Sequence, residues 1–272
     1  MELDWYTGKY LRSSEVNLLK GVWSKDLHSL LFYFIHICMK KLVVLTGAGI
    51  SAESGINTFR DMAEGYWHKY KVEDVCTHRA LVEHPQDVLD FLNYFYDDAK
   101  DRQPNAAHLA LKELESQFDV VVVTQNIDDL HEKAGSSNII HFHGELATVC
   151  STRNPNLIVK RTDLEDPHIT VNSIGPDGHG LRPNVVLFDE AVPKFEDAID
   201  AVREADIFVV IGTSMVVYPA ASLIQYIPDS THTYFIDPNP NSSMLGNPRI
   251  TVIPKKASEG VIDLAKLLDK EA

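Results

Sequence analysis

Short runs of apolar, mostly β-branched residues recur along the chain, separated by polar or glycine-containing segments. Such runs are typical of parallel strands that are covered on both faces. Each has four to six residues: Leu42–Thr46, Asp119–Thr124, Asn184–Phe188, Ile207–Ile211, Thr233–Ile236 and Ile250–Ile253. We expect these runs to form one sheet.

Segments with helical periodicity lie between the runs, namely Ala106–Gln117, Lys194–Glu204 and Ala220–Ile227. Alternating strands and helices predict an α/β fold with a Rossmann-like, doubly wound parallel sheet. In such a fold, ligands bind at the carboxyl ends of the strands. The candidate functional residues should therefore follow the strands.

Two inserts interrupt this alternation. The first, over about residues 60–100, has a mostly helical period. The second, Ala147–Leu181, is rich in turn residues and predicts a small irregular module held by apolar side chains such as Ile158, Ile169 and Ile174. The large Rossmann-like part then covers about residues 39–146 and 182–272.

Residues 1–38 form an N-terminal extension that matches no part of this pattern. It contains most of an apolar stretch, Leu27–Met39, which is too short to span a bilayer and is not followed by a small-residue cleavage site. It is either a buried or partner-facing helix, or it precedes a natural start at Met39.

The composition restricts the possible partners. The 272 residues carry a formal net charge of −14, which argues against nucleic-acid binding because that requires a basic face. No segment predicts membrane association, and the three cysteines, Cys38, Cys76 and Cys150, lack paired spacing. This usage fits a reducing compartment, so we expect a cytoplasmic protein. The oligomeric state has no signal in the sequence.

A glycine-rich motif, Gly47–Ala52, follows the first strand. It fits the G-x-G-x-x-A pattern, in which small residues let backbone N–H groups approach a pyrophosphate. Dehydrogenases with this motif need a second strand about 20 residues later that ends in an acidic ribose anchor. Here the next predicted strand begins only at Asp119, which argues against hydride transfer.

Four blocks together carry a more specific resemblance. Gly47–Arg60 (GAGISAESGINTFR), Thr124–Asp128 (TQNID), His141–Glu145 (HFHGE) and Gly212–Ser214 (GTS) resemble the sirtuin family of NAD-dependent protein deacylases in sequence and order. The resemblance implies that NAD is consumed as a cosubstrate. The acyl group of a modified lysine in a protein substrate would be transferred, giving nicotinamide and O-acyl-ADP-ribose.

The resemblance also implies three catalytic residues. His143 matches the family's general base, and a histidine that titrates near neutrality suits removal of a proton from a ribose hydroxyl. Asn126 and Asp128 match the pair that holds the ribose and the nicotinamide carboxamide. His131 and His141 are the competing histidines, for which we expect local packing or hydrogen bonding.

The remaining cofactor-binding positions follow from the same matches. Phe59 would cover the reactive ribose face, and Arg60 would meet phosphate. The full expected set also includes Gly47, Ala48, Gly49, Ser51, Ala52, Gln125, Asn126, Ile127, Asp128, Gly212, Thr213, Ser214, Asp237, Pro238, Asn239 and Ala257.

The chain departs from the family at its zinc site. The usual small domain holds a structural zinc with four cysteines, but Ala147–Leu181 offers only Cys150. A mixed site from Cys150, His168 and His179 matches no structural zinc spacing. We therefore expect no zinc and no other bound metal.

The substrate-binding region departs as well. Val186, Leu187 and Phe188 match the strand that binds the peptide, but Asp189 replaces the usual glycine. Leu92 and Phe95 occupy the positions of a Tyr-x-x-Arg pair that recognises acidic acyl groups in one branch of the family. We therefore expect neutral acyl groups to be preferred, unless Lys100 or Arg102 supplies the missing cation.

Two other functions use the same scaffold. An NAD hydrolase or mono-ADP-ribosyltransferase would break the same bond with another acceptor, and Asp189 and the unusual module keep this alternative open. A non-enzymatic NAD or ADP-ribose sensor is the third possibility. The intact His143 argues against the sensor, because holding a ligand does not require a base.

Overall fold

The computed structural model describes residues 2–3, 10–11, 39–56, 71–240 and 247–269. The chain divides into two units, Met1–Lys40 and Lys41–Ala272. In the first, β1 (Glu2–Leu3) pairs with β2 (Tyr10–Leu11) in antiparallel fashion. The apolar stretch that begins at Leu27 lies, up to residue 38, outside the described residues.

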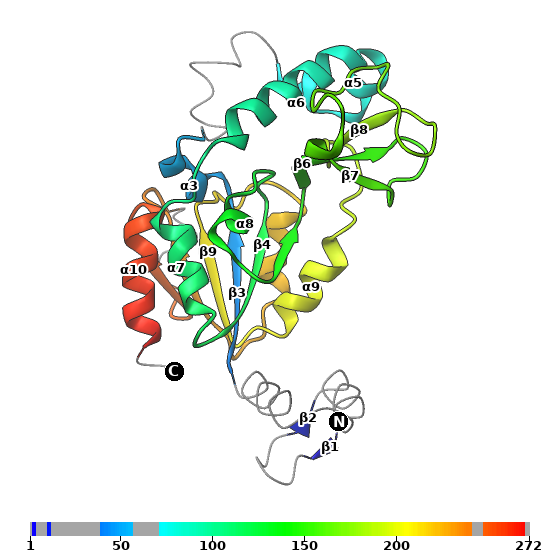
Figure 1. The fold of residues 1–272 in the computed structure, drawn as a ribbon. Coiled ribbons are helices and arrows are strands. Elements are labelled where there is room, and N and C mark those ends of the chain that lie inside the picture. Colours follow the sequence, from blue (N-terminus) through cyan, green and yellow to red (C-terminus); the bar gives the residue numbers. More distant parts are fainter. Residues whose placement is uncertain (1, 4–9, 12–38, 57–70, 241–246, 270–272) are drawn as a thin grey trace, which may run out of the picture. The chain divides into compact units, whose positions relative to one another are not determined.

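The second unit contains a six-stranded parallel sheet with the order β11-β10-β9-β3-β4-β5 (Figure 1). The three central strands are almost wholly buried, as expected for runs covered on both faces. The strands are β3 (Lys41–Thr46), β4 (Asp119–Thr124), β5 (Ile139–His141), β9 (Ile207–Ile211), β10 (His232–Ile236) and β11 (Ile250–Ile253).

Helices cover both faces of this sheet, which confirms the doubly wound fold. Because side chains alternate along a strand, Leu42 and Val44 belong to one core and Val43 and Leu45 to the other. The first core contains side chains of α7 (Ala106–Leu114) and α10 (Ala257–Leu268). The second contains those of α9 (Phe195–Arg203) and the 3₁₀ helix η5 (Ala220–Tyr226).

The prediction that Asn184–Phe188 belongs to the main sheet is wrong. The strand here is β8 (Leu181–Val185), which pairs antiparallel with β6 (Gly144–Ser151) in a separate sheet that also contains β7 (Ile158–Lys160). Val185 and Leu187 bury their side chains in a core with the helical insert, so the apolar run reflects packing outside the main sheet. The sixth strand, β5, has only three residues.

The helical insert packs against this small sheet. Its described helices are α4 (Val72–Val75), α5 (His78–Glu83) and α6 (Pro85–Lys100), and α6 begins with proline at its first position, where the missing N–H costs nothing. Leu89 of α6 joins Val149, Ile169 and Leu181 in a small core. Of the apolar residues expected to hold the module, Ile169 is buried, but Ile158 and Ile174 are 51% and 61% exposed.

A fully buried arginine, Arg161, lies where the module meets α6. It begins a short 3₁₀ helix, η4 (Arg161–Asp163). Its Nε donates to the Leu146 carbonyl (2.8 Å), and its Nη1 donates to Asn93 Oδ1 (2.8 Å) and to the Pro167 carbonyl (2.7 Å). Its guanidinium lies over the Tyr96 ring at 4.8 Å. Arg161 thus ties α6 to β6 and to the loop that follows η4.

Among the described residues, no helix is long and apolar enough to cross a membrane.

Candidate functional site

A cavity of about 910 Å³ opens at the carboxyl ends of β3, β4, β9 and β10 and extends between α6 and the segment after β8. Its lining includes every predicted cofactor, catalytic and substrate residue except Phe59 and Arg60, which lie outside the described residues. Four loops that are distant in the sequence meet here because parallel strands end at one edge.

Glycines at two strand ends form the floor of this cavity. Gly49 donates its backbone N–H to the Gly212 carbonyl at 2.8 Å. A Cβ on Gly49 would lie 2.6 Å from Gly212 Cα, and a Cβ on Gly47 would lie 2.7 Å from Thr213 Cβ. Gly212 also has a φ of +62°, in the left-handed region. Only glycine fits at these contacts, so the loops after β3 and β9 are locked together.

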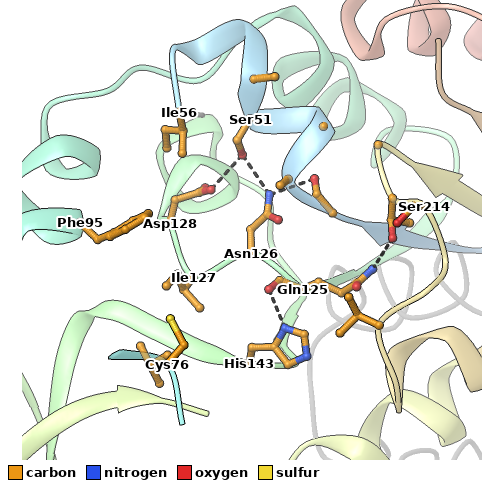
Figure 2. A pocket seen from close by; sticks show the side chains of 18 of the residues that line it. Ser51, Ile56, Cys76, Phe95, Gln125, Asn126, Ile127, Asp128, His143 and Ser214 are labelled. Atoms are coloured by element: carbon orange, nitrogen blue, oxygen red, sulfur yellow. Dashed lines mark hydrogen bonds between the residues drawn. The ribbon is translucent and has the colours of Figure 1, made fainter. Parts of the chain in front are cut away.

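Three buried polar side chains, Ser51, Asn126 and Asp128, line the cavity and are joined by hydrogen bonds (Figure 2). Asn126 Nδ2 donates to the Gly47 carbonyl (3.2 Å) and to Ser51 Oγ (3.0 Å), and Ser51 Oγ donates to Asp128 Oδ2 (2.9 Å). Burial raises the pKa of the Asp128 carboxyl, whereas the bonds from Ser51 and from the Leu130 N–H oppose this shift. The network fixes these side chains in the positions from which they line the cavity.

His143 lies on the same wall, after β5. Its Nδ1 is 2.8 Å from the Gln125 carbonyl, which can only accept, so Nδ1 carries the proton and Nε2 is left as an acceptor. Burial lowers the pKa of His143, and the bond to Gln125 opposes this only in part. The ring is therefore neutral at pH 7 and able to accept a proton.

The competing histidines do not line the cavity. His131 bonds to Thr46 Oγ1 (3.1 Å), and burial lowers its pKa to about 3. Burial lowers the pKa of His141 too, but the hydrogen bond that its ring donates to Glu132 and the charges of Glu132 and Glu145 outweigh this effect, so the pKa is raised. Of the three, His143 is the one placed to reach a ligand.

The cavity wall near α6 is apolar. Leu92 and Phe95 line it together with Phe91, Val72 and Cys76, and burial raises the pKa of the Cys76 thiol to about 12, so the thiol is uncharged. Val72, Phe91 and Cys76 are not predicted from the sequence, because residues of a helical insert follow no motif. Phe91 lies one helical turn before Phe95 on α6, so this helical spacing was a signal from which Phe91 could have been predicted.

Neither candidate cation faces this wall. Lys100 Nζ pairs with Asp97 Oδ1 at 2.7 Å, and Arg102 Nη2 pairs with Asp98 Oδ1 at 2.7 Å. Of these four residues, only Asp98 lines the cavity. Both candidate cations are therefore already paired with carboxylates, and neither lines the cavity.

The structure does not assemble the conceivable zinc ligands. His168 Nε2 pairs with Asp97 (2.9 Å), and His179 Nδ1 bonds to the Asp177 carbonyl (3.0 Å). Within the described residues, Glu132, His141 and Glu145 are the only group of three metal-binding side chains with ligand atoms within 4.8 Å of one another. With one cysteine and two histidines that have other partners, the small module does not fit the four-cysteine zinc site that the family resemblance implies.

Comparison with known proteins agrees with the geometry. Residues 47–219 match the Sir2 family. An NAD-dependent protein deacylase of Bacteroides thetaiotaomicron is 49% identical over 85% of this chain and 98% of its own length. One from Helicobacter pylori strain 26695 is 45% identical over 76% of this chain and 88% of its own. The solved structure of a Sir2 homologue in complex with NAD has a TM-score of 0.73 at 34% identity, covering 91% of this chain and 96% of that one.

Proposed function

The chain belongs to the Sir2 family and is an NAD-dependent protein deacylase, and we propose that His143 is the general base of its reaction. NAD, when bound, supplies a ribose carbon whose bond to nicotinamide can be exchanged for a bond to the acyl oxygen. The observation that carries the proposal is the neutral His143, held by Gln125 with its Nε2 free on the wall of the glycine-floored cavity.

The cavity residues fit the NAD molecule in two respects. Gly47 and Gly49 leave no side chain between the backbone and the cavity floor, which allows close approach of a pyrophosphate. Asn126 and Asp128 present an amide and a carboxylate, which suit a ribose hydroxyl and a carboxamide N–H. We propose that these residues orient the cosubstrate, together with Ser51, Gln125, Thr213, Ser214 and the residues after β10, Asp237–Asn239.

In this proposal the acyl-lysine binds on the side of the cavity that faces α6 and the segment Val186–Phe188. Val186 donates its N–H to the His143 carbonyl at 2.9 Å, so the segment Val186–Phe188 lies directly beside the base. Leu92 and Phe95 then contact the acyl chain. An acidic acyl group would place a carboxylate on an apolar wall without a cation, which is unfavourable, so neutral acyl groups are preferred.

We place this reaction in the cytoplasm, where NAD is available and where the free thiols of Cys76 and Cys150 remain reduced.

The test is His143→Ala, with His179→Ala as a control at an exposed histidine outside the cavity lining. We expect the His143 variant to bind NAD but to lose about 10²–10⁴-fold in deacylation of an acetyl-lysine peptide. Mass spectrometry of the products identifies the reaction. Wild-type activity in His143→Ala would refute the role of the base, and free ADP-ribose or an ADP-ribosylated protein would favour the hydrolase or transferase.

A further inference from the structure

One carboxylate at the cavity has no partner among the residues that the structure describes. Six acidic residues line the cavity, and in five of them a described group contacts the carboxylate: Glu53 (Ser258), Asp98 (Arg102), Asp128 (Ser51), Glu190 (Arg182) and Asp237 (Asn239). Asp189 makes no hydrogen bond or ion pair with any described residue, and it is exposed. Its charge is therefore available to a ligand.

The backbone at Asp189 has an unusual conformation that its neighbours hold in place. Its φ is +70°, in the left-handed region that glycine adopts freely and that Asp and Asn tolerate better than other residues. On either side of it, the Phe188 N–H is bonded to the Cys76 carbonyl at 2.8 Å, and Glu190 is bonded to Arg182 and to the Leu187 N–H. The turn is thus held by its neighbours, while the Asp189 side chain makes no hydrogen bond or ion pair that would hold it within the described part of the chain.

Exposed apolar side chains from two segments lie at the same cavity as Asp189. Phe188 is 49% exposed, and Val216, Val217 and Tyr218, after β9, are 63%, 38% and 72% exposed. Asp189, Phe188, Val217 and Tyr218 all line the cavity. Exposed apolar groups at a cavity are typical of a surface that binds a partner, and Asp189 adds to them a carboxylate that no described residue contacts by a hydrogen bond or ion pair.

We propose that Asp189 selects acyl-lysine substrates that carry an arginine or lysine within one or two residues of the modified lysine. The inference rests on the proposed function, because it assumes that the acyl-lysine lies beside Val186–Phe188. An extended peptide advances about 3.3 Å per residue, so a charge adjacent to Phe188 is within reach of the nearest flanking side chains only. Among the described residues of the cavity lining, Lys256 is the one lysine, and it precedes Ala257, one of the expected cofactor-binding residues.

The test compares matched peptides in which each position flanking one acetyl-lysine is changed in turn from Arg to Glu. We expect the wild-type protein to prefer Arg at one or two adjacent positions by roughly three- to ten-fold in kcat/KM at low salt, the range for an exposed ion pair and its like-charge counterpart. The preference should shrink as the ionic strength rises.

Two variants separate charge from backbone. Asp189→Asn keeps the shape and tolerates the same φ, and Asp189→Gly relaxes the turn; both should lose the preference while still deacylating a peptide with neutral flanking residues. An equal rate for Arg and Glu peptides in the wild type, or an Arg preference that persists in Asp189→Asn, would overturn the inference. Failure of every peptide to be deacylated would instead overturn the proposed function, and this inference with it.

Discussion

Replacing Arg161 by methionine tests whether this buried cation, in place of a metal, holds the small module to α6. The change removes three donors and leaves the acceptors on Asn93, Leu146 and Pro167 buried. Hydrogen bonds to a charged group contribute roughly 1.5–3 kcal/mol each. Against this gain stands the cost of burying the charge, which lowers the pKa of Arg161 to about 10 and corresponds to roughly 3 kcal/mol.

The difference predicts a loss of roughly 1.5–6 kcal/mol in the free energy of unfolding. For a unit of this size, that lowers the melting temperature by about 10 °C. The melting temperature of Arg161→Lys should fall between those of the wild type and Arg161→Met, since one ammonium group cannot reach all three acceptors. Because α6 also carries Leu92 and Phe95, we expect KM for an acetyl-lysine peptide to rise as well.

Thermal unfolding followed by circular dichroism measures the effect, with Arg153→Met as a control at an exposed arginine of the same module. Exhaustive chelation should leave the melting temperature of the wild-type protein unchanged, and metal analysis should find no stoichiometric zinc. A melting temperature of Arg161→Met within about 1 °C of the wild type would refute the reasoning, as would unfolding of the module by a chelator.

Three further predictions concern acyl choice, pH and the N-terminus. Replacing Leu92 by tyrosine and Phe95 by arginine together should raise kcat/KM for a succinyl-lysine peptide at least about ten-fold by pairing its carboxylate; no gain would mean that these positions do not contact the acyl group. Burial lowers the pKa of His108 to about 4 and that of His131 to about 3. Below about pH 6.5 both histidines become protonated in the unfolded chain but stay neutral in the folded protein. The free energy of unfolding is therefore highest above that pH and falls as the solution is acidified. We expect a loss of roughly 2 kcal/mol per histidine at pH 5, measured by urea unfolding; a free energy equal to that at pH 7, or unchanged pH dependence in glutamine variants, would contradict this. A protein that begins at Met39 should fold and deacylate at the rate of the full chain, and an insoluble or inactive product would show that the extension is required.

The central strands could be predicted from the sequence, because a strand that is covered on both faces requires a continuous apolar run. The site residues that follow these strands could be predicted too, because parallel strands all end at the same edge of the sheet. That logic placed Gly47, Asn126 and Gly212 around one cavity. It failed at β8, whose buried residues face the helical insert. It could not find Arg161, since a lone arginine between turn residues has no periodic signal and its partners come from distant segments.

The locked glycine floor has a consequence for ligand recognition. Because the Gly49 and Gly212 backbones are already in contact, a ligand seated there orders little further chain, and this part of the site contributes affinity with a small entropic cost. The floor acts as a fixed template whose shape a ligand must match as it stands. Variation in what the enzyme accepts must then arise on the opposite wall, where α6 and the residues around Asp189 present side chains that can be exchanged without disturbing the floor.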